Sequence, residues 1–202
     1  MLNSRLCACL LVASAACSSS SSDIDSNEQA RRAYLGLDGS IGKSLALGFD
    51  GFNTATNANI APQLDAGTKA GMLTITGQVD QGSSANKGMR LRVGMVGYTD
   101  GPFVVDDKDT KIEVVYDTAA DVTTQPALTL SLKGIPTGTL DGTLIGTYHL
   151  SGDLAGDVTL NLTFAGMLQD AGGGDVTRAP GTTTITGTAT QGDGVYDVML
   201  TL

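Results

Sequence analysis

Apolar and polar residues alternate almost without a break over residues 140–164, and this regularity constrains the fold more than any other feature. Successive side chains of a β-strand point to opposite faces, so a period of two predicts strands with one apolar and one polar face. The break at Ser151 and Gly152 between the two runs is typical of a hairpin. The apolar or small side of this hairpin consists of Leu140, Gly142, Leu144, Gly146, Tyr148, Leu150, Leu154, Gly156, Val158, Leu160, Leu162 and Phe164.

Weaker copies of this alternation follow one another along the rest of the chain. They lie at residues 41–49, 73–79, 89–95, 112–116, 128–132, 184–191 and 195–202. Residues 53–67 are expected to form a loop, because they are rich in Asn, Thr, Ala and Pro. Strands that follow one another through short turns pair as an antiparallel meander. We expect an all-β domain of about eight or nine strands, closed as an up-and-down barrel, with a two-layer β-sandwich as the alternative.

One helix is expected ahead of the strands, over residues 23–37. Ser26 and Gln29 have the spacing of a capping box, and Gly36 could end the helix. The 27 glycines and the absence of tryptophan suit turns and half-buried strands better than a helical bundle. The formal net charge of -9 would repel a phosphate backbone, so we expect no nucleic acid among the partners.

The first 16 residues have the layout of a signal peptide. Arg5 supplies a positive charge ahead of the uncharged apolar segment at residues 6–16, which ends in small residues. That segment is shorter than the roughly 20 residues that a helix needs to span a bilayer. We therefore expect residues 1–16 to be removed.

Ser14, Ala15, Ala16 and Cys17 resemble the lipobox of bacterial lipoproteins, in which small residues precede the processed cysteine. In that family the cysteine becomes the first mature residue and its sulfur carries a diacylglycerol, so the resemblance implies lipidation of Cys17. The chain departs from the family pattern at Ser14, where the family usually has leucine. Cleavage by an ordinary signal peptidase after Ala15 is the alternative, because Ala13, Ser14 and Ala15 fit an A-x-A site.

The positions of the three cysteines favour lipidation. Cys7 and Cys9 lie inside the apolar segment, with too little apolar length before them to be the processed residue. The mature chain keeps at most Cys17, which excludes a disulfide framework. Residues 18–22, all serine, are expected to form a flexible tether. Ser18 directly after the cysteine implies, by the same resemblance, sorting to the bacterial outer membrane, on its periplasmic or surface face.

The expected organisation is therefore a signal peptide at residues 1–16, a lipidated tether with a possible short helix at 17–38, and a β domain at 39–202. The lipid bilayer is the expected partner, through the acylated Cys17. Because each buried acyl CH₂ contributes about 0.8 kcal/mol, more than one chain would give stable anchoring.

Few side chains of the mature chain suit catalysis. His149 is the only histidine and lies on the polar side of its expected strand, and no nucleophile motif of the G-x-S-x-G type occurs. We therefore expect no enzyme, no catalytic residue and no cofactor. Asp106, Asp107 and Asp109 are weak candidate ligands for calcium, since calcium prefers carboxylates. Their spacing is not that of an EF-hand, and a solvated turn explains them more simply.

Two features leave room for a binding function. Gly142, Gly146 and Gly156 on the apolar side would open space for a small apolar ligand inside a barrel, or else mark strand curvature and close packing. Threonines at every second position from 184 to 190 could contact an ordered surface such as a glycan, or simply occupy exposed strand positions. We expect a membrane-anchored lipoprotein with a non-catalytic binding or structural role, with a small apolar ligand as one option. The alternative is a secreted or surface structural or interaction protein with a filled β core. The sequence determines neither the ligand nor a protein partner.

Overall fold

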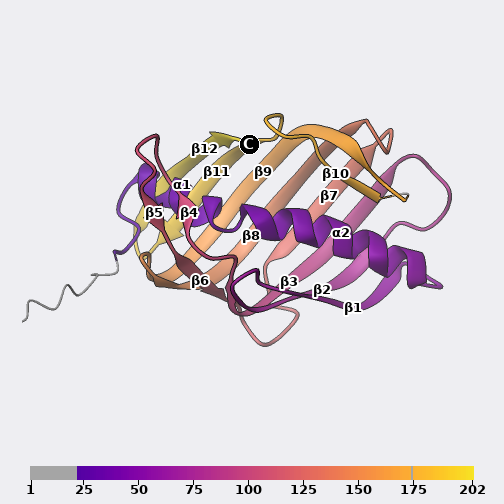
Figure 1. Cartoon of the computed structure of the whole chain (residues 1–202). Coiled ribbons are helices and arrows are strands. Elements are labelled where there is room, and N and C mark those ends of the chain that lie inside the picture. The colour runs from indigo at the N-terminus through magenta and orange to yellow at the C-terminus, as the bar shows by residue number, and fades with distance from the viewer. Residues whose placement is uncertain (1–21, 174) are drawn as a thin grey trace, which may run out of the picture.

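The computed structural model describes residues 22–173 and 175–202 (Figure 1). Two helices, α1 (Asn27–Leu35) and α2 (Asp38–Thr54), precede the strands. The strands are β1 (Asn59–Ala66), β2 (Ala70–Val79), β3 (Lys87–Thr99), β4 (Phe103–Val104), β5 (Lys111–Ile112), β6 (Val114–Asp117), β7 (Ala127–Lys133), β8 (Thr139–Gly152), β9 (Gly156–Gly172), β10 (Asp175–Arg178), β11 (Thr184–Gln191) and β12 (Gly194–Thr201). Ten of them form one sheet, and β4 pairs with β5 as a separate hairpin.

The sheet is a large antiparallel meander, which confirms the predicted β class. Its strands lie in the order β1-β2-β3-β6-β8-β9-β11-β12. The short strands β6 and β7 both lie between β3 and β8, and β10 pairs with β9. The hairpin expected at residues 140–164 is present as β8 and β9. As the alternation predicted, Leu144 and Leu162 are buried, whereas Asn161 and Thr163 face solvent.

The expected strand at residues 41–49 is wrong, because this segment belongs to α2. Alternation at positions 45, 47 and 49 fits a strand, but the same residues also fit a helix whose apolar side returns every three or four positions. Most of the buried residues of α2 follow that helical spacing, namely Ser40, Ile41, Ser44, Leu45, Gly48, Phe49 and Gly51. The β domain therefore contains a long helix, which corrects the expectation that residues 23–37 held the only one.

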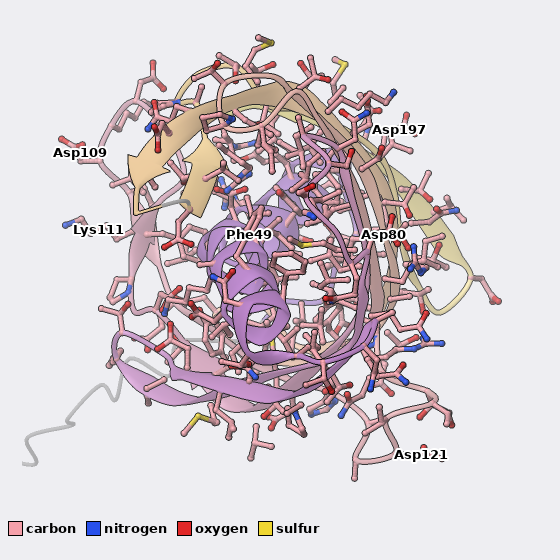
Figure 2. All side chains as sticks on the ribbon, turned by 90° about the vertical axis from the view of Figure 1, so that its right-hand side faces the viewer. Phe49, Asp80, Asp109, Lys111, Asp121 and Asp197 are labelled. Carbon is pink, nitrogen blue, oxygen red and sulfur yellow. The ribbon has the colours of Figure 1, made fainter. Side chains whose placement is uncertain are left out.

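Helix α2 lies on the concave side of the sheet, as the end view in Figure 2 shows. Phe49 points toward the middle of the molecule, whereas Asp80, Asp121 and Asp197 lie at its periphery. Ile41 and Phe49 belong to the same buried cluster as the apolar sides of β2, β3, β8 and β9. The core is thus made by one face of the sheet closing over a helix.

Two glycines let α2 approach the sheet closely. A Cβ added to Gly48 would lie 2.7 Å from Sδ of Met89 in β3. A Cβ added to Gly51 would lie 2.9 Å from Cβ of Ile60 in β1. The contact between helix and sheet therefore depends on the absence of side chains at these positions.

The expected helix at residues 23–37 is present as the shorter α1. Ser26 is its N-cap and accepts a hydrogen bond from the Gln29 amide (3.3 Å), and Gly36 follows its last turn. The side chain of Gln29 accepts from the Asp25 amide (2.8 Å), so it does not close a capping box on Ser26. Ile24 and Tyr34 are buried in the core, which means that the packed domain begins well before the expected boundary at residue 39.

Strands β1 and β12 are the two ends of the sheet, and no ladder joins them within the described residues. Strand β1 occupies part of residues 53–67, so the loop expected there is wrong over Asn59–Ala66. The run expected at 112–116 is divided, since Ile112 pairs with Phe103 in the β4–β5 hairpin and Tyr116 lies in β6. No helix within residues 22–173 and 175–202 is long and apolar enough to cross a membrane.

Candidate functional site

The predicted lipidation site, Cys17, lies outside the described residues, together with the signal peptide at 1–16 and residues 18–21. Ser22, the last residue of the expected tether, is held on the domain. Its amide donates to the Asp153 carbonyl and its own carbonyl accepts from the Ala155 amide, both at 3.1 Å. Lipidation of Cys17 stays a prediction, but the point at which the chain reaches the domain is defined.

A side chain at any of the three inward glycines would collide with neighbouring atoms. A Cβ on Gly142 would lie 2.6 Å from the Thr129 carbonyl oxygen, and one on Gly146 would lie 2.4 Å from Cα of Pro126. Gly156 has a φ of 101° and its Cβ would lie within 2.2 Å of the Gln191 side chain. These glycines permit close approach of neighbouring strands, which is the second of the two explanations given for them.

A shallow trough of about 500 Å³ lies on the outer face of the sheet. Strand register places Thr186, Thr163, Thr143 and Thr129 side by side on β11, β9, β8 and β7. The hydroxyls of Thr163 and Thr186 are 2.9 Å apart and bond each other. The trough is lined by Thr129, Ser131, Asp141, Gly142, Thr143, Thr163, Phe164, Ala165, Thr184 and Thr186.

This trough can hydrogen-bond a polar partner, and most of its exposed lining is apolar, from threonine methyls, Ala165 and Phe164. Hydroxyl groups both donate and accept, and the carboxylate of Asp141 accepts. Asp141 also lies 3.7 Å from Nζ of Lys133, in an exposed and therefore weak ion pair. The threonines of β11 are thus part of a wider hydroxyl surface that extends over four strands. The sequence of one strand does not show which strands lie beside it.

His149 lies on the same outer face, between two carboxylates. Its Nδ1 is 2.8 Å from Oδ1 of Asp157 in β9, and Asp117 in β6 is its register partner on the other side. All three line a hollow of about 320 Å³. The side chains of His149 and Asp157 are 61% and 76% exposed, so water screens their attraction. The nearby hydroxyls of Thr147 and Thr159 bond each other (2.8 Å), and no hydroxyl bonds His149 in the described part of the chain.

The calcium candidates Asp106, Asp107 and Asp109 lie in the turn between β4 and β5, and Figure 2 places Asp109 far from the core. Oδ1 of Asp106 accepts the amides of Lys108 and Thr110, both at 3.0 Å. Hydrogen bonds from Thr110 and Lys108 lower the pKa of Asp106. Residues 22–173 and 175–202 contain no group of three or more His, Cys, Asp or Glu side chains arranged to hold a metal ion. These observations favour a turn-stabilising role for Asp106.

A partly buried charged pair joins α2 to β10, and no pattern in the sequence indicated it. Arg178 donates from Nη1 and Nη2 to the two carboxylate oxygens of Asp38, at 2.8 and 2.7 Å, and the Tyr34 hydroxyl donates to Oδ1 (2.7 Å). Burial disfavours the charge on Arg178, but its hydrogen bonds to Asp38 outweigh that effect and raise its pKa. The pair borders a hollow of about 330 Å³ and attaches the helix to the strand, which is a structural role.

A second network holds the other side of α2. Nζ of Lys43 and the Thr68 amide donate to Oδ1 of Asp100 (2.7 and 2.8 Å), and the Tyr98 hydroxyl donates to Oδ2 (2.7 Å). Burial alone would raise the pKa of Asp100, but these hydrogen bonds outweigh it and lower the pKa to about 2. Each donor serves the fold, and none is free to act on a substrate.

The chain matches no protein-family model, no curated protein and no solved structure.

Proposed function

We propose that this protein is a bacterial lipoprotein, anchored to the outer membrane through acylated Cys17, with a non-catalytic binding or structural role. The anchor rests on Ser14, Ala15, Ala16 and Cys17, which resemble a lipobox, and on the absence of any other cysteine after residue 9. The role of the domain rests on its core. The single observation that carries it is that α2 occupies the concave side of the sheet.

Because α2 fills the concave side of the sheet, we favour a domain that binds partners on its outer surface over one that binds an apolar ligand in its interior. Four hollows on the described part of the molecule are open to the surface, and the inward glycines are explained by close strand packing. Closure of the sheet into the expected barrel would need a pairing of β1 with β12, and this role does not require it. We therefore favour the filled-core reading, in which the domain interacts through its exterior.

The hydroxyl-lined trough is the part of the outer face best suited to a polar partner. It gathers side chains from four strands, and those strands are held rigidly by their ladders. A rigid array of hydroxyls loses little conformational entropy when it binds. We assign His149 no catalytic role, because no hydroxyl of the described residues bonds it and it is largely exposed.

The intact mass of the protein purified from membranes of a bacterial host tests the anchor. We expect the wild-type chain to begin at Cys17 with the added mass of a diacylglyceryl group, and Cys17→Ser to lack that mass and leave the membrane fraction. An unmodified wild-type chain that begins at Ala16 would contradict lipidation and support cleavage after Ala15.

The Cys17→Ser protein then tests the core without interference from a covalent lipid. We expect its mass under native conditions to equal the mass of the chain alone, because the interior is occupied by α2. A bound apolar molecule that survives purification and is released on unfolding would instead support an internal ligand.

A further inference from the structure

The chain enters the domain at one end of the sheet and is fixed there. Ser22 forms an isolated bridge with Leu154 in the turn between β8 and β9. Ile24 is 2% exposed, and its amide donates to Oε1 of Gln191 (2.5 Å). Nε2 of Gln191 in turn donates to the Ala155 carbonyl (3.0 Å). The entry point therefore lies between the β8–β9 turn and the β11–β12 turn, and buried contacts hold it in place.

Little chain remains between this point and the proposed anchor. Five residue steps separate Cys17 from Ser22, and even a fully extended chain covers at most about 3.6 Å per step, or about 18 Å in all. The opposite end of the sheet is farther away than that. Strand β9 rises about 36 Å between Gly156 and Met167, at about 3.3 Å per residue.

We propose that the end of the sheet carrying the β8–β9 and β11–β12 turns is held against the lipid bilayer, and that the opposite end is displayed away from it. This orientation rests on the proposed attachment of lipid to Cys17. The membrane-facing end comprises Ser22, residues 153–155 and residues 191–194. The displayed end carries the loop at residues 134–138 and the end of β9 at Gly172.

The negative charge of the membrane-facing end argues against attraction to the bilayer surface. Asp23, Asp25 and Asp193 are exposed at or beside the entry point, so this end is acidic and the headgroups of anionic lipids repel it. Attraction by the bilayer surface does not hold the domain down. The short connection between Ser22 and the anchor does, so we expect the non-lipidated domain to have no affinity for vesicles.

The proposed orientation also determines where the hydroxyl trough lies relative to the bilayer. Asp141 and Thr143 lie toward the displayed end of β8, about 33 and 26 Å along the strand from Ser151 at about 3.3 Å per residue. The trough is therefore presented outward, whereas the hollow beside His149 lies nearer the bilayer.

Energy transfer from a single tryptophan tests the orientation, because the natural chain has none. Asp193→Trp marks the membrane-facing end and Thr137→Trp marks the displayed end, and both positions are exposed. Each variant, acylated at Cys17, is inserted into phosphatidylcholine vesicles that contain a dansyl-headgroup lipid as acceptor. We expect transfer from position 193 to be several-fold more efficient than transfer from position 137.

A matched control lengthens the connection. Twenty Gly and Ser residues inserted between Ser21 and Ser22 would let the domain turn over, since a flexible segment of that length spans about 25 Å on average. We expect the difference between the two positions to shrink in this variant. Equal transfer from both positions with the natural connection would overturn the proposal.

The orientation can be tested separately from acylation in the host. If the intact mass shows no acyl group, the mature chain is coupled through its Cys17 thiol to a maleimide lipid, and the same two positions are compared. Missing acylation would then contradict the proposed anchor alone, whereas equal transfer in the coupled protein would contradict the orientation.

Discussion

Asp100 joins three separate parts of the chain through one carboxylate. It accepts from Lys43 in α2, from Thr68 in the turn between β1 and β2, and from Tyr98 in β3. The pKa of Asp100 is lowered to about 2 from its ordinary 3.8 because these donors outweigh the effect of burial. A carboxylate with a lowered pKa stabilises the folded state at pH values above its ordinary pKa, and that contribution is lost as the pH falls through the folded pKa.

We expect Lys43→Met to raise the pKa of Asp100, because the burial remains while the ammonium donor is lost. The folded variant should begin to lose this stabilisation at a higher pH than the wild type does. At about pH 5 it should be less stable by about 1 kcal/mol, a small value because the pair is partly exposed. Carboxyl NMR titration and urea unfolding from about pH 2 to 6 measure both effects. Lys108→Met, which removes an exposed ammonium elsewhere, should change neither, and an unchanged Asp100 pKa in Lys43→Met would contradict the argument.

At the scale of single elements, α2 shows how a helix rich in glycine can be stable. Glycine costs roughly 1 kcal/mol relative to alanine in a helix interior, so its presence needs a reason. At Gly51 the reason is close packing, because a Cβ added there would lie 2.9 Å from Cβ of Ile60 in β1. Nothing lies within 4 Å of a Cβ added to Gly42. The two glycines therefore differ in packing while sharing the same helix.

This difference predicts opposite effects of one substitution. Gly42→Ala should stabilise the protein by roughly 0.5–1 kcal/mol, because the helix gains propensity without a clash. Gly51→Ala should destabilise it by about 1 kcal/mol, because the branched Ile60 side chain leaves no room and overpacking outweighs the gain in propensity. Urea unfolding of the two variants beside the wild type measures both. Stabilisation by Gly51→Ala would show that α2 does not pack closely on β1.

At the scale of the whole molecule, the sheet has a protected middle and two different ends. Strands β8 and β9 have neighbours on both sides, while β1 and β12 lie at the ends of the sheet. The Asp197 amide of β12 donates to Oδ1 of Asn27 in α1 (2.9 Å), so the helix covers part of that edge. Covering an edge strand with a helix or loop is one way to prevent pairing with another chain.

Amide hydrogen exchange should follow this arrangement. We expect the amides of Leu144 and Leu162 to exchange most slowly, and those of β1 and β12 to exchange faster, because local opening begins at the edges. Asn27→Ala should speed exchange at Asp197 while leaving the central amides unchanged. Equal protection of β1, β12 and the central strands would instead indicate that the two ends pair and that the sheet closes as a barrel.

Within the fold, the sequence was most informative where one face of a strand meets the core and the other meets water. The alternation in β8 and β9 therefore predicted a hairpin and its buried side correctly, although the turn lies at residues 153–155 and not at Ser151 and Gly152, which belong to β8. It was least informative for residues 41–49, where glycine, serine and leucine fit periods of two and of nearly four equally well. Strand β1 was missed because its Pro and Asn residues are typical of loops and its apolar residues are few.

For the candidate sites, the sequence alone indicated Cys17, because lipidation depends on a short linear signal that is recognised before the chain folds. The hydroxyl trough, the Arg178–Asp38 pair and the Asp100 network were decided only by tertiary structure. Each of them joins residues from separate strands or helices, and only strand register and helix docking bring such residues within hydrogen-bonding distance. The same holds for α2, since local preference leaves residues 41–49 undecided and burial against the concave side of the sheet selects the helix.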